Sequence, residues 1–205
     1  MKVPPTSFAD LLKPMYKNEV AINGNPTQAS AAFSAVFAAA LSNGGSLDDI
    51  TPGIAYFKKL HSVGNFVPVT ASAATMESGQ TPIVIWWDYL LASEIGPSVS
   101  GLKIVIPSDA TYAAYYDQAI SKYAPDPAAA RLWEEYLYSA TGQNLWLQGE
   151  ARPIELPTLV ADGTVDQAAY KALPPAPAGT VTFPTQAQQS AAENVVSQQW
   201  SSVIG

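Results

Sequence analysis

The chain has 205 residues, of which 48% are hydrophobic and 13% are charged, and its formal net charge is −7. So apolar a composition excludes an intrinsically disordered chain, and the acidic balance argues against a nucleic-acid partner, whose phosphates require clustered Lys and Arg. The sequence has no Cys, which excludes disulfides, thiolate nucleophiles and Cys-ligated metals.

The first quarter of the chain predicts two helices and one strand. Ser7 has the character of an N-cap, and the helix that it opens ends at Leu12, before Pro14. Residues 19–22 read as a short buried strand. A long alanine-rich helix is expected to open at Pro26 and Thr27 and to run to Ser42, with Phe33 and Phe37 at helical spacing.

The middle of the chain predicts further short elements. Pro52 opens a helix that ends near Gly64. Residues 65–80 suggest a strand and then a small helix. Residues 81–87 form an apolar, β-branched run bounded by turn signals, which predicts a buried strand. A helix over 89–94 follows, and residues 102–106 and 112–120 are expected to form further strands.

The second half of the chain predicts mainly helices. Asp126 and Pro127 suit an N-cap and a first helical position, and this helix should reach Tyr138. A second helix is expected over 139–148, and an amphipathic helix over 186–203. The proline-rich segment 150–185 predicts an irregular wrap. Because strands and helices alternate, we predict an α/β fold whose sheets are covered on both faces.

No motif for catalysis is visible in the sequence. His61 is the only histidine and is expected at the surface, and there is no G-x-S-x-G string to hold a nucleophilic serine. Phosphate-loop and dinucleotide-binding motifs are also absent. We therefore predict a protein that is not an enzyme and that has no cofactor and no metal site.

Several strings, in fixed order, resemble a known family. Residues 5–22, PTSFADLLKPMYKNEVAI, are similar to the segment P-x-S-W-x-D-L-L-x-P-x-Y-K-G-K-V-A of family 1 extracellular solute-binding proteins of ABC importers. These belong to the ferric iron, polyamine and aminoethylphosphonate class. Further similar strings follow at 25–27, 43–46, 79–85, 124–130, 136–139 and 142–143.

The resemblance implies a type II periplasmic-binding-protein-like α/β fold, in which two lobes are joined by hinge strands. In the family the segment like 5–22 enters the second lobe. We therefore expect residues 8–104 to form the second α/β lobe. Residues 105–205 would form the hinge return and the C-terminal helical part of the first lobe, with most of the N-terminal lobe missing. Such a chain would hold half a cleft, and we expect it to bind its solute weakly or not at all by itself.

The resemblance also implies a function. The protein would be a periplasmic monomer that captures a small polar solute, which could be an amine, a phosphonate or a zwitterion. It would deliver this small-molecule solute to an ABC transporter permease in the inner membrane, and any signal peptide would lie upstream of Met1. Two alternatives stay open: an enzyme on the same two-lobe fold, and a non-catalytic interaction domain in which residues 150–185 dock a partner.

Ligands of open α/β sheets bind beyond the carboxyl ends of strands, and three segments qualify. The first contains Asn25, Thr27, Gln28 and Ser30, in a turn that leads into a helix. Free N–H groups and the dipole at a helix start favour an anion. The alternative, plain helix capping, is equally supported by these residue types.

The second segment is Trp86, Trp87, Asp88 and Tyr89, at the end of a predicted strand. Alternation places Trp86 and Asp88 on one face and the other two on the opposite face. An indole beside a carboxylate suits a cationic amine, through cation–π attraction and charge pairing. The alternative is that both tryptophans pack in the core.

The third segment contains Tyr112, Tyr115, Tyr116 and Asp117, in which Tyr115 and Asp117 share a face if the segment is a strand. By resemblance to the polyamine binders of the family, Tyr115 and Asp117 would hold an amine. Ferric binders carry a tandem tyrosine after the strand at 81–87, and its absence here disfavours iron. We expect the second and third segments to line one shared opening.

Overall fold

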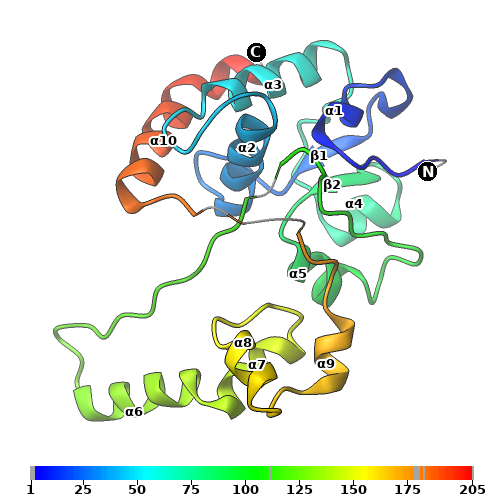
Figure 1. The fold of residues 1–205 in the computed structure, drawn as a ribbon. Coiled ribbons are helices and arrows are strands. Elements are labelled where there is room, and N and C mark those ends of the chain that lie inside the picture. The colour runs from blue at the N-terminus through cyan, green and yellow to red at the C-terminus, as the bar shows by residue number, and fades with distance from the viewer. Residues whose placement is uncertain (1–2, 111, 178–180, 182, 205) are drawn as a thin grey trace. The chain divides into compact units, whose positions relative to one another are not determined.

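The structure is a computed structural model that describes residues 3–110, 112–177, 181 and 183–204 (Figure 1). It divides into two compact units. Unit 1 combines residues 1–114 with residues 175–205, and unit 2 consists of residues 115–174. Each unit is described by itself.

This division differs from the boundary at 104/105 that the sequence suggested. The segment after residue 104 lies with unit 1 because Ala110 is buried in its core and the Tyr112 ring stacks on Phe37. The C-terminal helices lie there because Val196 and Trp200 are buried in the same core. The assignment of the units to the two lobes of the family stays a prediction.

Unit 1 contains a small parallel sheet. Strand β1 (Val20–Ile22) pairs with β2 (Ile83–Ile85) in a register that sets Ile22 opposite Ile85. An irregular segment lies along the other edge of β1, where Phe66 forms an isolated parallel bridge with Val20. Every residue of β1 is buried, as expected for the central segment of a covered parallel sheet. The predicted strands at 19–22 and 81–87 are thus present, the second of them shortened.

Two long helices of unit 1 pack closely because the residues at their contact have small side chains. Helix α2 (Ser30–Ser42) buries much of its alanine-rich surface, and α3 (Thr51–Ser62) crosses it at Gly53. A Cβ atom at Gly53 would lie 2.1 Å from the Val36 carbonyl oxygen. The first helix begins at Ser30, later than predicted, because the Asn25 carbonyl accepts bonds from the next turn's amides and closes a separate turn.

Both ends of the chain complete the core of unit 1. Helix α1 (Phe8–Leu11) has Ser7 as its N-cap, as predicted, and a 3-10 turn, η1 (Pro14–Tyr16), follows it. At the other end, α10 (Gln186–Gln199) and α11 (Ser201–Ile204) pack on α3. The Trp200 ring meets Phe57 edge-on at 5.5 Å between centroids.

A second, smaller cluster in unit 1 holds the elements around β2. Helix α4 (Ala73–Glu77) contributes Met76, and the helix after β2 contributes Leu91 and Ile95. The predicted helix at 89–94 is confirmed in position. It comprises α5 (Asp88–Leu90) and a π-helical turn, η2 (Leu91–Ile95).

Two predicted strands are wrong. Residues 102–106 have no strand partner, although Leu102 and Ile104 pack beside the smaller cluster. Residues 112–120 also form no strand beyond an isolated bridge at Tyr112, and most of them are exposed. Their alternating aromatic and apolar residues satisfy the local preference for extended backbone, but a ladder needs a neighbouring strand.

Unit 2 consists of four helices. They are α6 (Pro127–Tyr138), α7 (Ala140–Gln148), α8 (Leu156–Ala161) and α9 (Gln167–Ala172). The first two were predicted, and in the structure their N-caps, Asp126 and Ser139, accept from the backbone nitrogens of Ala129 and Gly142. The other two lie in the segment predicted to be irregular.

The core of unit 2 is small. Its buried hydrophobic residues are Leu147, Leu159 and Val165. Polar side chains hold the helices together: the Gln143 amide donates to the Leu137 carbonyl oxygen, and its own carbonyl oxygen accepts from the Glu155 amide nitrogen at 3.0 Å.

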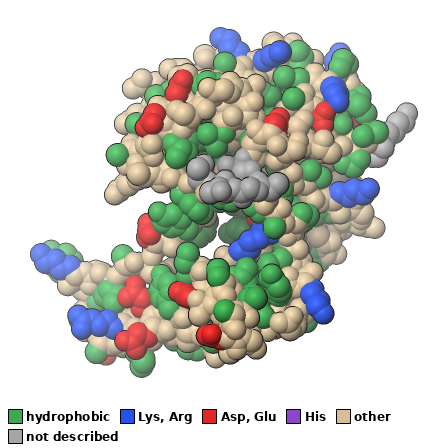
Figure 2. All heavy atoms as spheres, viewed as in Figure 1, with side chains coloured by type: hydrophobic (Ala, Val, Ile, Leu, Met, Phe, Trp, Pro, Cys, Tyr) green, Lys and Arg blue, Asp and Glu red, His purple; other side chains and the backbone are tan. Residues whose placement is uncertain are grey.

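Surface charge is dispersed. On the face drawn in Figure 2, Lys and Arg side chains are scattered and do not gather into one basic patch. Scattered charges of this kind create no concentrated positive potential on that face. Within the described residues, no helix is both long and apolar enough to cross a membrane.

Candidate functional site

The parallel pairing of β1 with β2 brings two of the three candidate segments to one edge of the sheet. Because Ile22 lies opposite Ile85, the loops that follow the two strands leave the sheet at its carboxyl edge. The first loop carries residues 23–29 into α2, and the second carries residues 86–88 into α5. This edge is where open α/β sheets bind ligands.

The loop after β1 presents polar groups to solvent. Asn25 forms a turn in which its side-chain oxygen accepts from the backbone nitrogen and the hydroxyl of Thr27, both at 2.9 Å. Asn25, Thr27, Gln28 and Ser30 are all exposed. The N-cap of α2 is Ala29, which has no side-chain acceptor. The capping alternative for Thr27 and Ser30 is therefore wrong, and the helix begins without a side-chain cap.

Sequence reasoning missed one residue of this loop, Asn23. Its side-chain nitrogen donates to the Ala71 carbonyl oxygen at 3.0 Å, and the Ala71 nitrogen donates to Ile22. Asn23 thus ties the end of β1 to the segment along its other edge. The following Gly24 has a φ of +104°, which glycine adopts readily. The Asn-Gly pair, which is typical of a turn, was the available signal in the sequence.

The loop after β2 is half-buried throughout, from Trp86 to Tyr89. Trp86 packs on the smaller cluster beside Met76 and Leu91, so the core alternative holds for this tryptophan. Trp87 occupies the N-cap position of α5 without a side-chain cap bond. The Asp88 carboxylate accepts from the Tyr89 backbone nitrogen at 2.9 Å. The loop thus holds a partly exposed indole next to a partly exposed carboxylate.

The third candidate segment is divided between the units. Tyr112 belongs to unit 1, where its ring stacks on Phe37 at 5.0 Å between centroids. Burial raises the pKa of Tyr112, an effect opposed by a hydrogen bond with Ser34, so the phenol stays neutral near pH 7. Tyr115 and Tyr116 belong to unit 2 and are 60% and 70% exposed. Asp117 follows them and is exposed.

This division bears on the expectation of a shared opening. Tyr112 contributes to the core of unit 1, whereas Tyr115, Tyr116 and Asp117 are exposed residues of unit 2. An opening shared by residues 86–89 and 112–117 therefore stays a prediction.

One hollow lies in unit 2, and none of the candidate residues lines it. Its volume is about 150 Å³, whereas small-molecule sites usually enclose about 300–1,000 Å³. The lining residues are Gln118, Ala119, Ile120, Ser121, Ala124, Ala130, Trp133, Glu134 and Leu137. Its size and open apolar lining do not make it a solute site.

The groups at the carboxyl edge of the sheet suit binding more than bond-making. They offer amide, hydroxyl and carboxylate oxygens, an indole ring and the start of a helix. Elsewhere in unit 1, His61 is half-buried on α3 with its ring edge-on to Phe66 at 6.4 Å. Across the parts of the chain that the structure describes, no three His, Asp or Glu side chains gather as metal ligands.

Comparisons with known proteins agree with this geometry. A family model described as "Bacterial extracellular solute-binding protein" matches residues 1–178. A crystal structure of an ABC transporter from Clostridium perfringens ATCC 13124, solved at 1.85 Å, superposes with a TM-score of 0.68 at 18% sequence identity. The match covers 99% of this chain, which spans 64% of the length of that one. No curated protein matches the chain significantly.

Proposed function

This chain belongs to the bacterial extracellular solute-binding proteins, and from that premise we propose that it captures a small polar solute for an ABC transporter. The observation that carries the proposal is the parallel register of β1 and β2. It places the polar loop at 23–30 and the Trp-Asp loop at 86–89 at one edge of a sheet, where α/β folds bind their ligands.

The chemistry of the two loops supports a solute that carries both charges. The start of α2 has no side-chain cap, and the positive end of a helix dipole favours an anion. Asp88 and the half-buried Trp87 suit an amine, through charge pairing and cation–π attraction. We therefore propose a zwitterion such as an aminophosphonate, ahead of a simple amine or a ferric ion.

Unit 2 is proposed to be part of the other lobe. Its helix α6 contains no buried residue, and Leu132 and Trp133 are 69% and 61% exposed. Apolar surface this extensive is normally covered by other protein. About a third of the solved chain that superposes on this one lies outside the match. Polypeptide corresponding to that additional third would complete the lobe and cover α6.

The mechanism that follows is capture by closure. The solute first contacts the loops after β1 and β2, and the completed lobe that includes residues 115–117 then closes over it. Tyr115 and Asp117 would reach the solute from that side. The closed protein would deliver the solute to a permease in the inner membrane, which places the protein in the periplasm. No step changes a covalent bond of the solute.

A thermal-shift screen of the product of the complete gene tests this function. Spermidine, 2-aminoethylphosphonate, ethylphosphonate and ferric citrate are compared, since a ligand that binds the folded state raises Tm in proportion to its affinity. We expect 2-aminoethylphosphonate to give the largest rise, and Asp88→Asn to reduce it.

Asp48→Asn is the matched control, because Asp48 is an exposed carboxylate of unit 1 that accepts a bond from Gln188. A panel in which no compound raises Tm would contradict the proposed function. Equal effects of the Asp88 and Asp48 variants would remove Asp88 from the site.

A further inference from the structure

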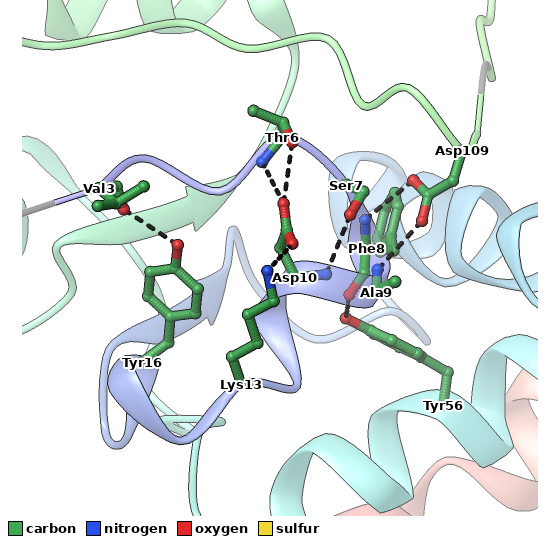
Figure 3. Close-up of polar contacts among 10 residues, drawn as sticks. All are labelled: Val3, Thr6, Ser7, Phe8, Ala9, Asp10, Lys13, Tyr16, Tyr56 and Asp109. Carbon is green, nitrogen blue, oxygen red and sulfur yellow. Dashed lines mark hydrogen bonds and ion pairs between the residues drawn. The ribbon is translucent and has the colours of Figure 1, made fainter.

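Two segments that are far apart in the sequence are joined at the start of α1 (Figure 3). The Ser108 nitrogen donates to the Thr6 carbonyl oxygen at 3.0 Å. The Asp109 carboxylate accepts from the Phe8 nitrogen at 2.9 Å with one oxygen and from the Ala9 nitrogen at 3.0 Å with the other. The segment that leads toward unit 2 is therefore held against the segment that opens unit 1.

This carboxylate is additional to the ordinary cap of the helix. The first N–H groups of a helix have no partner within it. Ser7, the local N-cap, accepts only from the Asp10 nitrogen, at 3.0 Å. The N–H groups of Phe8 and Ala9 are left for Asp109, which lies about a hundred residues further along the chain. Mutation of Ser7 and mutation of Asp109 can thus separate the local from the remote hydrogen bonds at the start of α1.

A third element holds the same peptide from the opposite side. The Tyr56 hydroxyl, from α3, donates to the Phe8 carbonyl oxygen at 2.7 Å in a buried position. Figure 3 shows Tyr56 and Asp109 reaching Phe8 from different elements. Because the Phe8 amide and carbonyl are both bound by remote side chains, the start of α1 is a fixed point to which Asp109 attaches the outgoing chain.

The attachment continues beyond Asp109. Ala110 is 8% exposed within the core, and Tyr112 stacks on Phe37 of α2. The boundary between the compact units comes shortly afterwards, at 114/115. The outgoing chain is therefore held on unit 1 at Ser108, Asp109, Ala110 and Tyr112, shortly before that boundary.

We infer that Asp109 is a positioning residue for solute capture: it fixes the outgoing segment to α1, so that movement between the units pivots after Tyr112. The inference rests on the proposed function, because the motion that it locates is the closure over a solute. Without this carboxylate, the segment at 105–110 would separate from α1, and the pivot would shift back into unit 1.

Residue-resolved amide hydrogen exchange on the full chain gives the first test, with Asp109→Ala compared against Ser7→Ala. Loss of Asp109 should speed exchange of the Phe8, Ala9 and Ser108 amides together by about ten-fold, as expected when charge-assisted hydrogen bonds are lost. Loss of Ser7 should speed exchange of the Asp10 amide and leave Ser108 protected. The milder Asp109→Asn variant should give an intermediate effect and serves if Asp109→Ala does not fold.

The second readout is the distance between the units, measured with spin labels on Lys58→Cys and Asp162→Cys. Both sites are exposed, and the absence of native Cys leaves no competing label site. Asp109→Ala should broaden the distance distribution, whereas Ser7→Ala should not.

An unchanged Ser108 amide, or equal distributions in the two variants, would overturn the inference and reduce Asp109 to a helix cap. Neither measurement uses a solute. If no solute raises Tm in the thermal-shift screen, the exchange and distance measurements on Asp109 can still be interpreted. The proposed function and the role of Asp109 are therefore tested separately.

Discussion

The two units of this chain handle their apolar residues in opposite ways. Unit 1 buries aromatic and aliphatic side chains from both ends of the chain in one core, which includes Phe57 and Trp200 at its centre. Unit 2 buries Leu147, Leu159 and Val165 and leaves Leu132 and Trp133 on its surface. Unit 1 has the core of an independent domain, and unit 2 does not.

The difference teaches that amino-acid composition alone does not decide whether a segment can fold independently. Unit 2 spans residues 115–174, and a segment of about 60 residues buries too little surface to be more than marginally stable by itself. Helix α6 is amphipathic and well capped, yet within the described residues no element packs over Leu132 or Trp133. We therefore expect unit 1 to set the global stability and unit 2 to melt separately.

The largest expected effects come from two glycines at helix crossings. Gly53→Ala would place a Cβ atom 2.1 Å from the Val36 carbonyl oxygen, between α2 and α3. We expect a loss of about 3 kcal/mol or more from unit 1, because backbone atoms on both helices must separate. Gly142→Ala would meet the Tyr136 carbonyl oxygen at 2.2 Å and should unfold unit 2 while unit 1 stays folded.

Urea denaturation followed by near-UV circular dichroism and by hydrogen exchange distinguishes the two glycine variants. Ala55→Gly, at an exposed position of α3, is the control and should cost about 1 kcal/mol from helix propensity alone. A single transition lowered equally by Gly53→Ala and Gly142→Ala would show that the units fold as one.

Leucine truncations in the two cores sharpen the comparison. Leu60 and Leu147 are both fully buried, one in each unit, and Leu→Ala in a core costs about 2–5 kcal/mol. We expect Leu60→Ala to lower the main unfolding transition. Leu147→Ala should remove exchange protection from α7 and α8 without shifting that transition. A shift of the main transition by Leu147→Ala would contradict the separation of the units.

Surface substitutions on α6 should behave differently from any core change. Because Leu132 and Trp133 are mostly exposed, the double variant Leu132→Gln/Trp133→Gln should change unfolding free energy by less than about 0.5 kcal/mol. It should reduce self-association at high concentration, measured by sedimentation velocity, because it removes the apolar surface of unit 2. A loss of several kcal/mol would mean that these side chains are covered in solution.

The smallest effect concerns acid stability in unit 1. The ion pair with Lys13 and hydrogen bonds from Thr6 hold the pKa of Asp10 well below its ordinary value of 3.8. A carboxyl whose pKa is depressed on folding stabilises the protein above its unfolded pKa, and this contribution disappears as pH falls toward the folded pKa. The Tm difference between wild type and Asp10→Asn should therefore be small at pH 7 and smaller at pH 2.5. A difference that grows with acid would contradict this sign.

Much of the fold could be predicted where the signal is local. The predicted N-caps Ser7 and Asp126 each marked a helix that the structure contains. The extended segments at 102–106 and 112–120 could not be distinguished from strands in the sequence. A residue pattern does not show whether a partner strand lies beside the segment. Helices α8 and α9 were missed because proline-rich sequence obscured their starts at Glu155 and Asp166.

The candidate site, like the fold, could be predicted only where the signal is local. The loops after β1 and β2 follow from strand order, and the register of the sheet places them together. The side chains within the loops were harder: Trp86 packs inward and Tyr112 joins the core, because both positions have apolar neighbours from distant segments. Asn23 was missed since its partner, the Ala71 carbonyl, is almost fifty residues away.

The central claim is that solute binds at the carboxyl edge of the sheet in unit 1. Two-dimensional ¹⁵N NMR of the 205-residue chain, titrated with 2-aminoethylphosphonate to tens of millimolar, tests it most directly, because amide shifts report even weak binding. We predict concentration-dependent shifts of amides at 23–30 and 86–89, with α10 unchanged as an internal reference. Shifts confined to the hollow around Trp133, with the amides at 23–30 and 86–89 unchanged, would contradict the account.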